Sequence, residues 1–154
     1  MLNKKNKDMS ELNPKNLNLS LKNLKFHEDM SEETPCFSAD LYENGKLIAH
    51  VKNSGRGGCN SIDPASGLKY KDVQHLTDID TDCYIMQLAG ELNFTKKNQS
   101  KAFVLKKGND LYTQAYPGNK KITDIKKAPN YKEWVKQQID ILNKKGFETL
   151  NTNL

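Results

Sequence analysis

The sequence has no long apolar run, no paired cysteine motif and almost no arginine. No stretch approaches the roughly 18 apolar residues of a transmembrane helix, and no apolar run follows the basic first residues as it would in a secretory signal. The three cysteines, Cys36, Cys59 and Cys83, form no C-x-x-C motif, which argues against a disulfide framework and a zinc site. We therefore expect a cytoplasmic protein with no membrane partner, in which each cysteine is a small buried thiol.

Length and composition indicate one domain with a polar N-terminal segment. A chain of 154 residues can bury one core, although the hydrophobic share is only 36%. Residues 1–18 have few apolar side chains and no periodicity, so burial cannot offset the entropy lost on ordering them. We expect a flexible segment over 1–18 and a single domain over 19–154.

The charges are distributed unevenly along the chain. Residues 1–93 contain 11 basic and 14 acidic residues, whereas residues 94–154 contain 13 lysines and 5 acidic residues. A basic C-terminal third is typical of proteins that bind an acidic or nucleic-acid-containing partner, although a merely solvated lysine-rich surface has the same composition. The one arginine, Arg56, stands out because its guanidinium can bind a carboxylate or phosphate through two bonds at once, which lysine cannot do.

Two hairpins and a first strand are the clearest structural predictions. Residues 36–53 alternate between apolar and polar on both sides of Asn44-Gly45, the strongest short signature of a two-residue hairpin turn. A second hairpin is predicted over 101–116 with its turn at 108–110, and a first strand over 19–27.

Helices are predicted after the first hairpin and near the C-terminus. Apolar residues at three- to four-residue spacing predict a short helix near 69–76 and a longer one near 80–92. The last helix is predicted to begin at Asn130, with Glu133 completing a capping box, and to stop at Gly146.

The remaining stretches complete the predicted fold. Loops are expected over 54–67 and 93–100, a strand or helical turn over 120–127, and a final strand over 147–154. Hairpins predominate and helices follow them. The sequence therefore predicts an α+β fold with a mainly antiparallel sheet built from two β-hairpins, on which two to three helices pack.

The glycine-rich stretch 54–60 is the first candidate binding site. Glycines let backbone N–H groups turn inward into a concavity that can bind an anion, and an arginine can add a charged contact. The spacing matches neither a P-loop nor a dinucleotide-binding fingerprint. A plain turn-rich loop is the alternative. The candidate anion- or partner-binding residues are Ser54, Arg56, Gly57, Gly58 and Asn60.

The second candidate surface lies in the basic third, where aromatic residues alternate with lysines. Such a combination can stack bases while lysines contact phosphates. Tyr131 and Trp134 are expected to belong to the core, whereas Tyr112 and Tyr116 are open to either interpretation. The candidate residues of this surface are Lys106, Lys107, Tyr112, Lys120, Lys121, Lys126 and Lys127.

One group of acidic residues resembles half of a calcium loop. Asp78, Asp80 and Asp82 have the spacing that opens an EF-hand, but Cys83 and Ala89 stand where the loop needs glycine and glutamate. We expect these acids to cap a helix, whose N-terminal dipole favours negative charge. No metal and no cofactor are predicted.

Catalytic residues are not predicted either. A Cys36–His50 or Cys59–His27 pair stays open, because such partners need only be close in space. A Cys/His-dependent enzyme is therefore kept as an alternative.

Residues 32–60, EETPCFSADLYENGKLIAHVKNSGRGGCN, resemble small uncharacterised proteins of AT-rich bacteria and of their phages and mobile elements. The resemblance extends over most of residues 20–154 and implies no catalytic residue. It implies an accessory role, such as anti-CRISPR-like inhibition of a host-defence nuclease complex by stoichiometric binding. We therefore expect a non-enzymatic binding protein, and the sequence does not determine its oligomeric state. A nucleotide- or nucleic-acid-binding protein that uses residues 54–60 and the basic third is the alternative.

Overall fold

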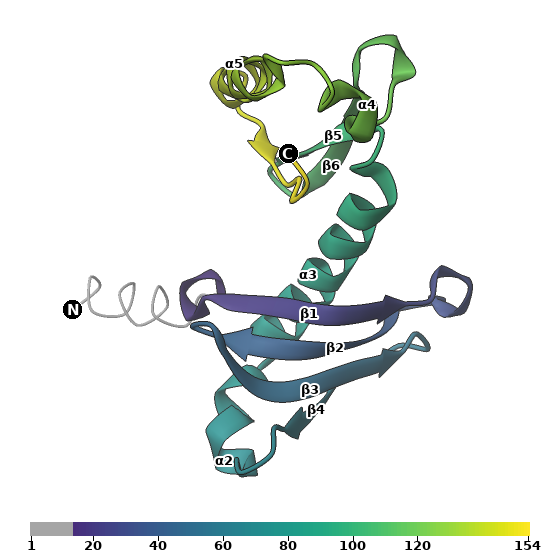
Figure 1. Ribbon diagram of the computed structural model, residues 1–154. Helices are drawn as coiled ribbons and strands as arrows, with labels where there is room; N and C mark the ends of the chain where they lie inside the picture. The colour runs from purple at the N-terminus through teal and green to yellow at the C-terminus, as the bar shows by residue number, and fades with distance from the viewer. Residues whose placement is uncertain (1–13) are drawn as a thin grey trace, which may run out of the picture. The chain divides into compact units, whose positions relative to one another are not determined.

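The computed structural model describes residues 14–154 and has an α+β fold with two antiparallel sheets (Figure 1). The predicted fold class is confirmed, and the two predicted hairpins belong to different sheets. Contacts group the chain into two compact units that divide between Leu92 and Asn93, inside its longest helix. A single domain over 19–154 stays a prediction. Of the segment predicted to be flexible, residues 1–13 lie outside the described range, while Pro14–Leu17 form the short 3-10 helix η1.

The first unit contains a four-stranded sheet in the order β1-β2-β3-β4, with antiparallel pairing throughout. Asn44 and Gly45 have φ angles of 52° and 79°, so the predicted β2–β3 turn is confirmed. A short fourth strand inside the predicted 54–67 loop makes that loop prediction wrong in part. The strands are β1 (Leu19–Phe26), β2 (Cys36–Glu43), β3 (Lys46–Ser54) and β4 (Ser61–Pro64), with the 3-10 helix η2 (Glu28–Met30) between β1 and β2.

Helices cover the inner face of this sheet. α2 (Tyr70–Val73) and η3 (Gln74–Leu76) occupy the predicted short helix, and α3 (Ile79–Asn98) follows. The predicted loop over 93–100 is wrong, because α3 continues to Asn98. The buried core contains apolar residues of β1–β3, α2, η3 and α3: Leu19, Phe37, Ala39, Leu41, Ile48, Ala49, Val51, Val73, Leu76, Ile85 and Ala89.

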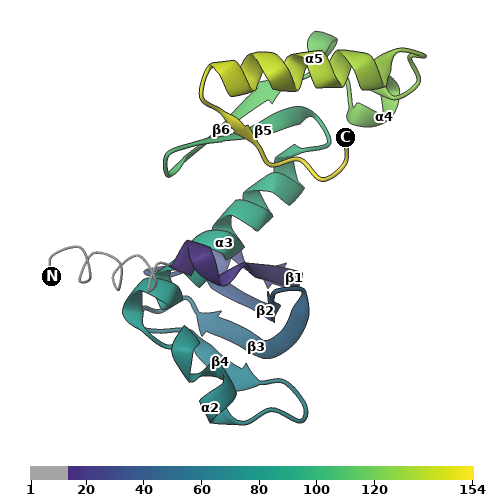
Figure 2. The ribbon, with the colours of Figure 1, turned by 90° about the vertical axis from the view of Figure 1, so that its left-hand side faces the viewer.

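The second unit contains a three-stranded sheet in the order β6-β5-β7 and a C-terminal helix that lies along it (Figure 2). The predicted second hairpin is confirmed, and the 120–127 stretch forms a helical turn. The core contains Phe103, Leu105, Tyr116, Ile122 and Leu142, with Trp134 packed against them. The elements are β5 (Ala102–Lys107), β6 (Asp110–Ala115), η4 (Pro117–Asn119), α4 (Ile122–Ile125), α5 (Tyr131–Lys144) and β7 (Glu148–Thr149).

The ends of α5 are formed differently from each other. Asn130 is the N-terminal cap residue, but its side chain makes no capping hydrogen bond, so the predicted capping box is wrong. At the other end, the N–H of Gly146 donates to the Asn143 carbonyl, and the N–H of Phe147 donates to that of Leu142. This pair of bonds is the Schellman arrangement, which ends the helix at the predicted glycine.

Beyond β7, the side chain of Asn151 adds hydrogen bonds to β5. The Asn151 Oδ1 accepts the N–H of Val104 at 2.7 Å, and its Nδ2 donates to the Ala102 carbonyl at 3.0 Å. The same Nδ2 lies 3.1 Å from the Tyr116 hydroxyl, which donates to the Gln99 carbonyl. Burial raises the pKa of Tyr116 to about 12, so this hydroxyl stays protonated at neutral pH. The residues after β7 are therefore fixed along β5 by this amide side chain together with the N–H of Leu150, which donates to the Val104 carbonyl at 2.8 Å.

Candidate functional site

A buried asparagine organises the glycine-rich loop 54–60. The Asn53 Oδ1 accepts the Thr34 hydroxyl at 2.6 Å and the N–H of Gly55 at 2.9 Å. Its Nδ2 donates to the Gly58 carbonyl at 3.3 Å and to the Asn60 Oδ1 at 3.1 Å. Because one side chain satisfies groups along the whole loop, the loop has a defined conformation.

Gly55 is the tightest position of this loop. Its φ is 82°, and a Cβ there would lie against the carbonyl oxygen of Met30 and 2.8 Å from the Cβ of Cys36. The Gly55 carbonyl accepts N–H groups from Glu32 and Glu33 at 2.9 and 3.0 Å. This glycine is therefore explained by close backbone packing without any ligand.

The backbone N–H groups of the loop are mostly used by the protein itself. Those of Gly55, Gly57 and Asn60 donate to side chains of Asn53, Thr34 and Asp82, respectively. The Glu33 carboxylate also lies against Gly57, 2.7 Å from where a Cβ would stand. These features work against an anion-binding concavity of backbone N–H groups.

Three of the predicted loop residues remain at the surface: Ser54 and Arg56 are exposed, and so is Gly58. No hydrogen bond or ion pair is formed by the Arg56 guanidinium within residues 14–154. Asn60, by contrast, is buried and serves the fold. The loop therefore offers an exposed guanidinium on a rigid support.

Asp82 anchors the loop to α3. It is only 4% exposed, and its carboxylate accepts the Asn60 N–H at 2.9 Å while its carbonyl accepts the Asn60 Nδ2 at 3.0 Å. Burial raises the pKa of Asp82 above its usual value, against the lowering effect of these bonds. Asp78 accepts the N–H of Thr81 at 3.1 Å, as expected of a helix cap. Hydrogen bonding from Thr81, first from its side chain and then from its backbone, lowers the pKa of Asp78.

The predicted basic surface divides into structural and exposed residues. The Lys107 Nζ donates to the Lys145 carbonyl at 3.2 Å and lies 5.1 Å from the ring centre of Phe147. Tyr112 is 44% exposed and packs edge-on against the same ring at 5.6 Å. Lys107 and Tyr112 therefore support the end of α5. Tyr116 is buried, which resolves its two interpretations in favour of the core.

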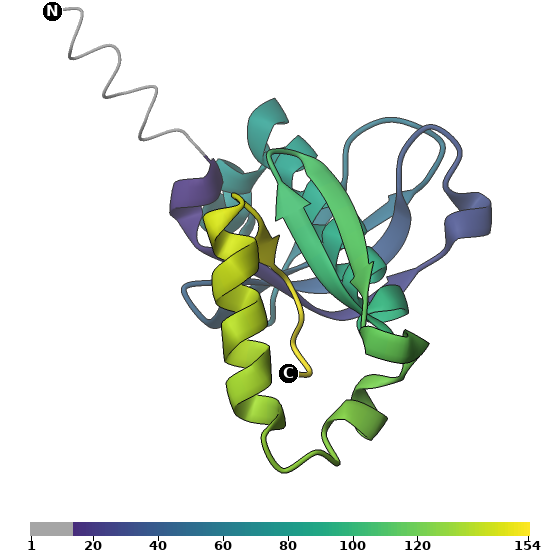
Figure 3. The same ribbon diagram turned by 90° about the horizontal axis from the view of Figure 1, so that it is seen from above.

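Four of the remaining lysines lie in the connection from β6 to α5, the green segment that contains α4 (Figure 3), whereas Lys106 lies on β5. Lys120, Lys121 and Lys126 are exposed, and their side chains make no hydrogen bond or ion pair within the described residues. Lys127 lies 3.4 Å from the Asp124 carboxylate. Lys106 is half-buried and has a partner. One surface segment thus presents three unpaired ammonium groups.

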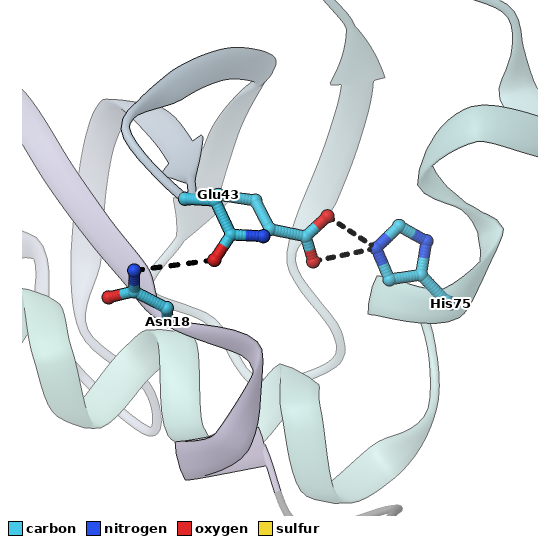
Figure 4. A network of polar contacts seen from close by, with 4 residues as sticks. Asn18, Glu43 and His75 are labelled. Atoms are coloured by element: carbon cyan, nitrogen blue, oxygen red, sulfur yellow. Dashed lines mark hydrogen bonds and ion pairs between the residues drawn. The ribbon is translucent and has the colours of Figure 1, made fainter.

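Two histidine–carboxylate pairs were not predicted. The His50 Nδ1 lies 2.7 Å from the Asp40 Oδ1. The His75 Nε2 lies 3.0 Å from both carboxylate oxygens of Glu43, linking η3 to the end of β2 (Figure 4). Near this pair, the Asn18 Nδ2 donates to the Asn44 Oδ1 at the hairpin turn.

A β-bulge explains why the Asp40–His50 pair was missed. From the Asn44-Gly45 turn, uninterrupted pairing would place Asp40 opposite Ala49. The register shifts between Leu41 and Tyr42, and this shift places Asp40 opposite His50.

The structure gives no support to the cysteine–histidine pairs that the sequence left open. Cys36 is buried as predicted, but Cys59 and Cys83 are exposed, so the prediction of buried thiols is wrong for those two. No side-chain hydrogen bond joins a cysteine to a histidine in the part of the chain that the structure describes. A Cys/His-dependent enzyme stays an untested alternative.

Over residues 14–154 no group of three or more acidic, histidine or cysteine residues could hold a metal ion. Over the same residues, no helix combines the length and the apolar character needed to cross a membrane. Comparison with protein-family models, with curated proteins and with solved structures finds no match to this chain. The resemblance to small proteins of AT-rich bacteria stays a prediction.

Proposed function

We propose that this chain is a non-enzymatic binding protein that contacts a nucleic-acid-containing partner through the lysines of residues 120–127. The observation that supports this most directly is the exposure of Lys120, Lys121 and Lys126 without carboxylate partners among the described residues. Unpaired ammonium groups on one short segment attract phosphates and release their counterions on binding.

The charge of the surrounding unit supports the same surface. The division between Leu92 and Asn93 coincides with the change of charge along the sequence: residues 93–154 contain 13 lysines and 5 acidic residues. The positive charge therefore belongs to one structural unit, which steers an acidic partner towards it.

Arg56 is a second contact in this proposal. Its guanidinium is exposed at the tip of a loop that the Asn53 contacts hold in place. A rigid support lowers the entropy cost of binding. The Arg56→Ala variant should weaken binding and leave the fold intact, and unchanged affinity would remove this loop from the proposal.

The kind of partner follows from the resemblance of residues 32–60. It favours a phage or mobile-element accessory factor that inhibits a host-defence nucleoprotein, such as a CRISPR-type nuclease complex, by stoichiometric binding. The direct test adds the protein to a purified complex of this type during target cleavage. Inhibition that is complete near one equivalent supports this partner, and undiminished cleavage at tenfold excess rejects it.

The binding surface itself is tested by charge removal. The triple variant Lys120→Gln, Lys121→Gln, Lys126→Gln is compared with a control that loses the same charge from the first unit, Lys46→Gln, Lys69→Gln, Lys71→Gln. Affinity for a fluorescent oligonucleotide is measured by anisotropy. The proposal predicts a loss of at least about tenfold for the first variant and less than about threefold for the control. Equal losses would show attraction by net charge alone and contradict a localised contact.

A further inference from the structure

The outer face of the four-stranded sheet has a row of basic and hydroxyl side chains. Backbone pairing aligns Lys25 of β1 with Ser38 of β2, and Ser38 with Lys52 of β3. Alternate residues of a strand point to opposite sides, and the neighbours Ala39 and Val51 point into the core. The two lysines therefore flank a serine on the face away from the core.

A second row runs parallel to the first, two residues along β2 and β3. Asp40 pairs with His50, and His50 pairs with Asp63 of β4. Asn23 completes this row from β1, where the strand register shifts and its φ is 54°. The Asn23 Nδ2 donates to the Asp40 Oδ2 at 2.7 Å.

These contacts fix the orientation and the proton of the imidazole. Hydrogen bonds from Asn23 and then from His50 hold the pKa of Asp40 below its usual value, so the carboxylate is ionised at neutral pH. An ionised carboxylate can only accept, so Nδ1 is the nitrogen that donates to Asp40, and in the neutral form of the imidazole Nε2 is then a hydrogen-bond acceptor. The side chain is 54% exposed, and Nε2 has no partner within residues 14–154.

Both rows border the same depression of the surface. Its volume is about 400 Å³, and side chains from β1, β2, β3 and β4 line it. This volume is in the range of small-molecule sites. Part of its polar lining is already held in position, since Asn23 and His50 are each bonded to Asp40.

We propose that this depression binds a small phosphate-bearing ligand with free hydroxyl groups, such as a sugar phosphate or a nucleotide. Lys25 and Lys52 bind the phosphate, with the Ser38 hydroxyl between them. The His50 Nε2 accepts a hydrogen bond from a ligand hydroxyl, and the Asp63 carboxylate can accept a second. The glycine-rich loop is not part of this site.

The spacing of the two rows fits this class of ligand. Two residues along a strand span about 6.6 Å, which matches the distance from a phosphorus atom to hydroxyls of an attached sugar ring. Lys25 and Lys52 are separated by two strand spacings, about 10 Å, which two extended lysine side chains can close around one phosphate. The site lies in the first unit, so it does not depend on the lysines of residues 120–127.

The test is an NMR titration of the full chain with glucose 6-phosphate, adenosine 5′-monophosphate, inorganic phosphate and glucose. The proposal predicts saturable shifts of the Ser38 and Lys52 amide signals with the two phosphate esters, weaker ones with inorganic phosphate and none with glucose. Tighter binding of one ester identifies its class. If neither ester shifts these signals at 10 mM, or glucose shifts them equally, the proposal is wrong.

Single substitutions test the contribution of each row of side chains to ligand binding separately. Lys52→Met should weaken binding of the esters at least about tenfold, whereas Lys46→Met, on the same strand but outside the depression, should change it less than about twofold. His50→Gln should weaken the esters and leave inorganic phosphate unchanged. Equal effects of the two lysine variants would show a non-specific attraction, and an unchanged ester affinity in His50→Gln would remove the second row.

Discussion

Two glycines of the 54–60 loop that differ in their surroundings give the sharpest test of how the loop is built. Gly55 and Gly58 have φ angles of 82° and 86°, so alanine at either position incurs a similar cost, about 1–2 kcal/mol. At Gly58 a Cβ meets nothing within 4 Å, so no steric cost is expected beyond that of the backbone conformation.

At Gly55 the added Cβ must displace the Met30 carbonyl. That displacement disturbs the bonds from the Glu32 and Glu33 N–H groups to the Gly55 carbonyl, each of which contributes about 1 kcal/mol. We therefore expect Gly55→Ala to lower the free energy of unfolding by about 3–4 kcal/mol and Gly58→Ala by about 1–2 kcal/mol.

Urea unfolding followed by circular dichroism measures both losses. Trp134, the one tryptophan, belongs to the second unit, so its fluorescence reports that unit separately. The Gly55→Ala loss should appear in the dichroism and be absent from the Trp134 fluorescence. Equal losses for the two variants would refute the view that close packing against Met30 determines the loop conformation.

Four further variants test hydrogen-bonded polar side chains at three positions, each by urea unfolding. Asn151→Ala should cost about 2–3 kcal/mol, because Val104, Ala102 and Tyr116 each lose a hydrogen bond; a loss below about 0.5 kcal/mol would contradict the role of this side chain. The pKa of Asp82 is raised in the folded protein, so the free energy of unfolding of the wild type should fall as pH rises from the ordinary carboxyl range to that raised pKa. The Asp82→Asn variant should not show this fall, and at pH 7 it should be at least as stable as the wild type. Asp82→Ala should be less stable than Asp82→Asn, since the N–H of Asn60 loses its acceptor. The pKa of Asp40 is lowered in the folded protein, so its contribution to stability is complete above its unfolded pKa of 3.8 and is lost as pH falls below that value. The Asp40→Asn variant should therefore lose less stability than the wild type as pH falls through this range. An equal loss in both proteins would refute the hydrogen-bonded role of the Asp40 carboxylate.

The hairpins were predictable because residues close together in the sequence determine them. Asn44-Gly45 fixes a turn through positive φ angles, and alternation on both sides fixes the faces. β4 was missed because Ser61–Pro64 has one aliphatic residue besides a proline, and its pairing depends on the exposed edge of β3. The end of α3 was missed because its apolar spacing stops while lysine and asparagine, which helices tolerate, continue to Asn98.

The candidate sites were predictable only where exposure follows from charge. The sequence identified Arg56 and the lysines at 120, 121 and 126, which are exposed. It did not show that Lys107 and Tyr112 support the end of α5, because their partner Phe147 lies far along the chain. The Asp40–His50 pair depends on a bulge of one residue, and no local sequence pattern predicts this bulge.

The salt dependence of nucleic-acid affinity tests the central claim most directly. The logarithm of the association constant for an oligonucleotide is plotted against the logarithm of salt concentration, for the wild type and for the Lys120, Lys121 and Lys126 glutamine variant. If the three ammonium groups contact phosphates, the variant should have a slope smaller by about 2–3, at 0.7–0.9 per contact. Parallel lines would mean that these lysines contact no phosphate, and the proposed binding surface would be wrong.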